Sequence, residues 1–124
     1  MANNLVYYFG KVSEAVGVLV TNKHDARERV RVASDYLFAV YPRELPASCR
    51  KDIEWIHHML MRYPAEHPYR SRVEATYHRT RNVTASKIAA RVWKLYHSIN
   101  SELEARDQEG DVRRTWEIDA HQTF

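Results

Sequence analysis

The feature that most constrains the fold is a set of apolar residues spaced alternately three and four positions apart in four separate segments. This spacing follows the period of the α-helix, ~3.6 residues, and gives each helix one stripe to bury. With only 3 Gly and 4 Pro in 124 residues, the chain has few turns, so the fold class predicted is all-α, a compact bundle of about five helices. The four stripes are Leu5, Phe9, Val12, Val16 and Leu19; Ala26, Val30, Ala33, Leu37 and Val40; Cys49, Ile53, Ile56, Leu60 and Tyr63; and Ala85, Ile88, Val92, Leu95 and Ile99.

Capping residues and prolines mark the expected helix ends. Asp25, followed three positions later by Glu28, resembles a capping box and would open the second helix. Pro42 should stop that helix and Pro64 the third, because the residue before a proline avoids the α region. The last helix should run from about Asn82 to about residue 107.

The C-terminal segment has a different pattern. After Gly110, the apolar residues Trp116, Ile118 and Ala120 alternate with acidic ones, which is the period of a strand or an extended arm. The sequence therefore predicts a bundle domain over residues 1–108 and an extended acidic C-terminal arm over 109–124. Trp116 would anchor this arm either on its own bundle or on a partner.

Charge is divided unevenly along the chain. Residues 62–94 carry eight Lys/Arg against two acids, whereas residues 102–124 carry three Arg against seven acids. Arginine outnumbers lysine 14 to 5, and its guanidinium group binds phosphate and carboxylate and stacks on aromatic rings. This division predicts a basic surface that binds a partner. The alternative is that the arginines of this region pair with the acidic tail of the same chain.

The basic surface is expected to centre on a helix over residues 69–81. Its narrow apolar stripe would be Tyr69, Val73, Tyr77 and Thr80, with arginines on both shoulders. Arginines can bind phosphate or acidic groups, and tyrosines can stack on bases or anchor a protein contact. The residues predicted to bind a macromolecule are Arg70, Arg72, Arg79, Arg81, Lys87, Arg91, Lys94, Tyr69, Tyr77 and Trp116.

The heptapeptide from Arg72 to His78, "RVEATYH", resembles the active-site pattern of HEPN domains, a family of small all-helical proteins that includes ribonucleases. The resemblance implies that Arg72 would steady a phosphate and His78 would act as a general acid or base. Val73 departs from the pattern, because the family has a polar residue after the arginine. The alternative is that His78 is an exposed helical histidine.

Other chemical motifs are incomplete. Glu54 and His57 form half of a carboxylate-bridged di-metal pattern, but a second half is missing, so no metal or cofactor is expected. Cys49 lies on an apolar stripe and is expected to be an inert core residue. "TASKIAARV" resembles the first helix of a helix–turn–helix motif, but the apolar stripe continues through "WKLYHSIN", which favours one long helix.

The single cysteine rules out a disulfide within the chain and favours a reducing cytoplasm. The N-terminal segment has neither the basic start of a signal peptide nor a long enough apolar run to span a membrane.

Because the chemical motifs are incomplete and the basic region is rich in arginine and aromatic residues, the predicted function is that of a small non-enzymatic subunit, regulator or inhibitor that docks on a nucleic-acid-handling assembly. Direct DNA or RNA binding through the Arg70–Lys94 region is the alternative, a HEPN-like ribonuclease the third class, and homo-oligomerisation is left open.

Overall fold

The computed structural model describes the backbone of residues 2–122 and the side chains of residues 4–107. Within that part, the chain forms five α-helices and a short 3₁₀ helix, and no strand. The elements are α1 (Ala2–Thr21), α2 (Ala26–Phe38), η1 (Pro42–Glu44), α3 (Ala47–Leu60), α4 (Arg72–Arg79) and α5 (Asn82–Gln122). The predicted all-α bundle is confirmed.

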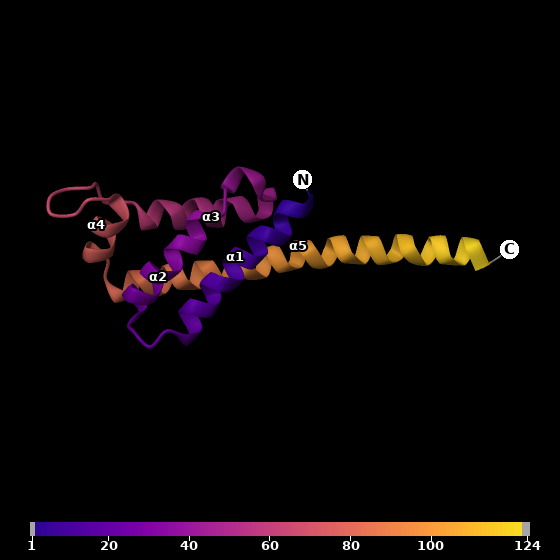
Figure 1. Ribbon diagram of the computed structural model, residues 1–124, viewed down its shortest axis with the longest axis horizontal. Coiled ribbons are helices and arrows are strands. Elements are labelled where there is room, and N and C mark those ends of the chain that lie inside the picture. Colours follow the sequence, from indigo (N-terminus) through magenta and orange to yellow (C-terminus); the bar gives the residue numbers. More distant parts are fainter. Residues whose placement is uncertain (1, 123–124) are drawn as a thin grey trace.

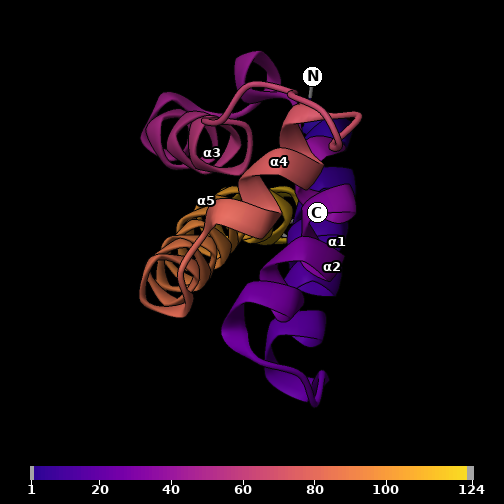
Figure 2. The same cartoon turned by 90° about the vertical axis from the view of Figure 1, so that its left-hand side faces the viewer.

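α5 is the central element of the bundle. It packs against α1, α2 and α3, and α4 crosses one end of the bundle beside the start of α5 (Figures 1 and 2). The segment considered for a helix–turn–helix motif lies inside α5, so the single long helix is confirmed. α5 continues as a helix to Gln122, past the predicted end of the last helix near residue 107. The side chains of residues 108–124 lie outside the described residues, so the domain boundary at residue 108 and the docking of the acidic arm stay predictions.

The helix ends follow the local chemistry of the sequence. Asp25 is the N-cap of α2, and its carboxylate accepts a hydrogen bond from the backbone N–H of Glu28 at 3.0 Å. This hydrogen bond is the main reason that the pKa of Asp25 lies below its ordinary value. Pro46 precedes the first residue of α3, where its missing N–H costs no helical hydrogen bond.

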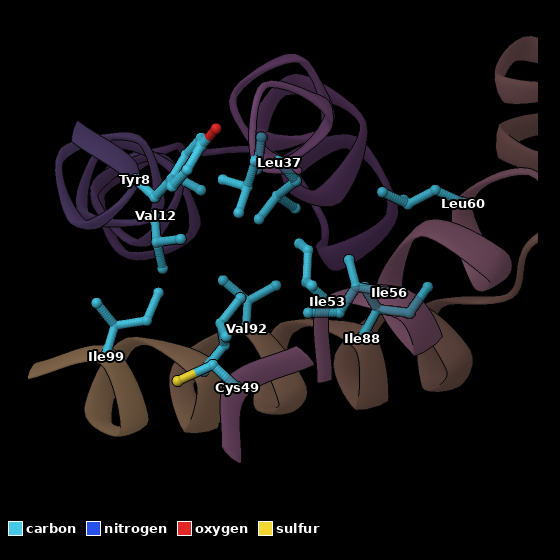
Figure 3. Packing of buried hydrophobic residues seen from close by; sticks show 14 of the residues in the cluster. Tyr8, Val12, Leu37, Cys49, Ile53, Ile56, Leu60, Ile88, Val92 and Ile99 are labelled. Atoms are coloured by element: carbon cyan, nitrogen blue, oxygen red, sulfur yellow. The ribbon is translucent and has the colours of Figure 1, made fainter. Parts of the chain in front are cut away.

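The core forms where the apolar stripes meet (Figure 3). All five stripe residues predicted for the last helix are buried, as are Ile56 and Leu60 of α3. Cys49 is fully buried and burial raises the pKa of its thiol, which fits the predicted core role.

The buried stripe of α1 differs from the prediction. Leu5 and Val12 are buried as expected, but Tyr8 and Ala15 complete the buried face, while Phe9 and Val16 are half-buried. Tyr8 tolerates burial because its hydroxyl donates a hydrogen bond to the carboxylate of Glu44.

Candidate functional site

α4, which lies within the basic region of residues 62–94, is shorter than predicted. Ser71 is the N-cap: its Oγ accepts from the backbone N–H of Glu74 at 3.1 Å. The helix therefore begins at Arg72, and Tyr69 lies before it. The buried side is formed by Ala75, Thr76 and Thr80, not by the predicted stripe through Tyr69, Val73 and Tyr77, which are half-buried.

The arginines around α4 remain at the surface. Arg70, Arg72, Arg79 and Arg81 are all exposed, as predicted. Arg62, which follows the end of α3, shares the Tyr63 ring with Arg79, and two arginines of α2 lie over the ring of Tyr77 in α4. We call this group the arginine cap; it consists of Arg27, Arg31, Arg62, Arg70, Arg72, Arg79 and Arg81.

Tyr77 connects α4 to α2. The guanidinium carbons of Arg27 and Arg31 lie 5.0 and 5.3 Å from the centre of its ring. Its hydroxyl donates to the Glu28 carboxylate at 2.6 Å, and this bond raises the pKa of Tyr77 because it favours the protonated phenol. The Tyr77 ring predicted to contact a partner is thus already in contact with arginines of its own chain.

Tyr63 forms a second arginine–ring cluster that sequence reasoning did not assign to the site. The guanidinium carbons of Arg62 and Arg79 lie 4.9 and 5.0 Å from its ring centre. Arg62 also donates to the Met59 carbonyl at 2.8 Å and to Thr80 Oγ1 at 3.2 Å. The sequence pattern places Tyr63 on the core stripe of α3, but α3 ends at Leu60.

These contacts hold arginines in place without neutralising them. A guanidinium group over an aromatic ring is attracted by the ring quadrupole but keeps its charge and N–H donors at its edge. No arginine of the cap has an ion pair within the part of the chain whose side chains are described. The cap is therefore a positively charged surface in which Arg27, Arg31, Arg62 and Arg79 are held by rings and Arg72 by a backbone carbonyl, whereas Arg70 and Arg81 extend free of such contacts among the described residues.

A pair of rings borders this surface. Tyr69 and His78 are stacked, with ring centres 4.5 Å apart and an interplanar angle of 16°. Tyr77 meets His78 edge-on at 4.9 Å. A depression of ≈ 500 Å³ lies between α2 and α4, and its lining is of mixed charge: it includes Arg31, Asp35, Ser71 and Glu74.

The remaining predicted basic residues lie on α5, and two of them pair with a carboxylate of α3. Arg91 donates to Asp52 of α3 at 3.1 Å, and the Lys94 ammonium lies 3.6 Å from the same oxygen. Asp52 is only 4% exposed, so these two cations compensate a buried carboxylate. Arg91 also lies 4.6 Å from the centre of the Trp55 ring. Lys87 is exposed, and the side chain of Trp116 lies outside the described residues.

Both residues of the HEPN-like pair contact other parts of the fold. Arg72 Nε donates to the Met61 carbonyl at 2.8 Å, whereas the His78 ring packs on Tyr69 and Tyr77.

The half di-metal pattern is likewise used within the fold. His57 Nε2 is 2.8 Å from the Leu37 carbonyl oxygen. Among the described residues, no group of three or more His, Cys, Asp or Glu is placed to hold a metal ion. In the same part of the chain, no helix has the length and apolar character needed to cross a bilayer.

No protein-family model, curated protein or solved structure gives a significant match to this chain. The site is therefore interpreted from its own residues and geometry.

Proposed function

We propose that this protein is a small non-enzymatic interaction protein that docks through its arginine cap on an acidic surface of a partner protein. The partner would belong to a nucleic-acid-handling assembly, as the division between a basic middle and an acidic C-terminal segment suggests. A cytoplasmic location remains part of this proposal.

The observation that carries the proposal is the ordering of charged guanidinium groups on tyrosine rings. Arginine and tyrosine are enriched among the residues that dominate protein–protein binding energy. Side chains that are ordered before binding lose less conformational entropy when the complex forms. Arg79 on Tyr63, and Arg31 on Tyr77, meet both conditions while keeping their charge.

Co-purification from a nuclease-treated lysate of the native host tests this function. Nuclease removes partners held only by shared nucleic acid. The informative variant is Arg70→Glu with Arg81→Glu, because both residues are exposed and neither side chain has a hydrogen bond or ion pair among the described residues.

The matched control is Arg43→Glu with Lys51→Glu, which makes the same change in charge outside the cap. We expect a partner that the parent and the control retain and that the cap variant loses. Equal retention by both variants would reject the cap as the docking surface.

Direct nucleic-acid binding is the second candidate, and the stacked Tyr69–His78 pair beside Arg70 favours it. Aromatic rings at the surface next to arginines are the elements of single-strand binding surfaces. A mobility-shift series with random DNA and RNA distinguishes the two functions. Direct binding predicts a complex that dissociates steeply with added salt, whereas protein docking predicts no shift.

A further inference from the structure

α5 has a solvent face that the arginine cap does not include. From the second residue of the helix to residue 101, the exposed positions follow one side of α5. They are Val83, Ser86, Lys87, Ala90, Trp93, Lys94, His97 and Ser101. We call these residues the α5 outer face.

A line of apolar and small residues runs along the outer face. Val83, Ser86, Ala90 and Trp93 are spaced three, four and three positions apart, on the opposite side of the helix from the buried stripe. We call these four residues the outer stripe. Val83 is 63% exposed and Trp93 51%. α5 therefore presents apolar side chains on two sides, although a helix at a bundle surface normally does so on one.

Trp93 is held in place by its neighbours. Its ring stacks on Tyr96 at 5.5 Å and 8°, and meets His97 edge-on at 4.3 Å. Tyr96 in turn stacks on Phe9 of α1 at 5.1 Å. The indole is thus an ordered exposed ring. Ala90, one turn before it, has a small side chain that leaves room for another helix to approach.

The charge along this segment has one sign. Residues 82–101 contain no Asp or Glu and three cations, Lys87, Arg91 and Lys94. Lys87 and Lys94 lie along one edge of the outer stripe, and the Lys94 side chain is 66% exposed despite its contact with Asp52. An occupant of the outer stripe meets positive charge on that edge.

We propose that the α5 outer face docks an acidic amphipathic helix of a partner protein. Its apolar residues lie on Val83 and Ala90 with Trp93 as the anchor, and its carboxylates pair with Lys87 and Lys94. Ser86, between Val83 and Ala90, is small enough to let the partner helix lie close. A second copy of this chain fits less well, because an antiparallel pair centred next to Ala90 would bring Lys87 opposite Lys94, and the one carboxylate beside Lys94, that of Asp52, is buried and already paired with Arg91.

The test uses the full chain and a labelled synthetic peptide of three heptads, with Leu at the a and d positions and Glu at e and g. A matched control peptide has Lys in place of Glu. Fluorescence anisotropy is expected to show saturable binding of the Glu peptide alone, weakened by added salt. Trp93→Ala and, independently, Ala90→Gln should each weaken binding at least about tenfold, because Trp93 is the anchor and Ala90 is the point of close approach.

Further variants assign the binding surface. Lys87→Glu should weaken binding, whereas Arg43→Glu, outside both surfaces, should not. The cap variant Arg70→Glu with Arg81→Glu should retain the peptide, so this proposal and the proposed function fail separately.

Three results would overturn the inference. They are absence of binding by the Glu peptide, binding that Trp93→Ala and Ala90→Gln leave unchanged, and binding that only the cap variant abolishes. Sedimentation showing a dimer that Trp93→Ala dissociates would assign the face to a second copy and would also overturn it.

Discussion

Removing Arg91 should destabilise the bundle more than removing the carboxylate that it pairs with. Arg91→Ala deletes the 3.1 Å hydrogen bond to Asp52, which is 4% exposed, and leaves the carboxylate with only Lys94 at 3.6 Å. An under-satisfied buried acceptor costs about 1–3 kcal/mol. The lost contact with the Trp55 ring adds about 0.5–1 kcal/mol.

Because the Arg91 side chain is 33% exposed and Lys94 can move closer, we expect a total near the lower end, about 1.5–3 kcal/mol. Asp52→Asn keeps the shape and removes a buried charge, so the lost ion pair and the recovered desolvation cost nearly cancel, within about 1 kcal/mol. Lys94→Ala, at a side chain 66% exposed, should cost about 0.5 kcal/mol or less.

Urea unfolding followed by circular dichroism measures all three variants, provided that each shows the parent's slope. Arg91→Ala should lose the most free energy of unfolding, and Asp52→Asn and Lys94→Ala should both stay within about 1 kcal/mol of the parent. An Arg91→Ala midpoint equal to that of the parent, or a Lys94→Ala loss as large as that of Arg91→Ala, would refute the reasoning.

Three other changes test the fold. Leu95→Ala should cost about 2–5 kcal/mol in urea unfolding, because Leu95 is fully buried; a parent-like midpoint would contradict the bundle core. Tyr77→Phe should cost about 1 kcal/mol through loss of the bond to Glu28 and should speed amide exchange in α4; unchanged exchange would show that the bond does not hold α4. Asp25→Ala should destabilise α2 at neutral pH. Because the folded pKa lies below the ordinary value of 3.8, this contribution is present above pH 3.8 and lost as the pH falls through the folded pKa, so parent and variant stabilities should converge in acid; a constant difference would contradict the cap.

Local rules predicted most of the fold from the sequence. The stripe of α5 is buried as predicted because its apolar residues keep one helical period without interruption. The stripe of α1 was misassigned because Leu5, Tyr8, Val12 and Ala15 follow the helical period as well as the predicted set does. What supports burial of Tyr8 is its bond to Glu44, 36 positions away, which local spacing does not reveal. α4 was predicted too long because Tyr69 was counted with the stripe and Ser71 was not recognised as its cap.

The candidate site was less predictable because its parts come from distant segments. Arg70, Arg72, Arg79 and Arg81 are at the surface as predicted, because an unpaired arginine is seldom buried, although only Arg72 and Arg79 lie on α4. The pairing of Arg91 with Asp52 joins residues 39 positions apart and could not be inferred from spacing. A signal for the α5 outer face was present, since residues 82–101 lack acids and contain a second line of apolar and small residues at three–four spacing.

The most direct test of the central claim is amide hydrogen exchange on the full chain, free and bound to the partner recovered by co-purification. Docking through the arginine cap predicts slower exchange in α4 and in the first turn of α5, with the rates in α1 unchanged. Protection confined to elements outside the cap, with α4 exchanging as in the free protein, would contradict the account.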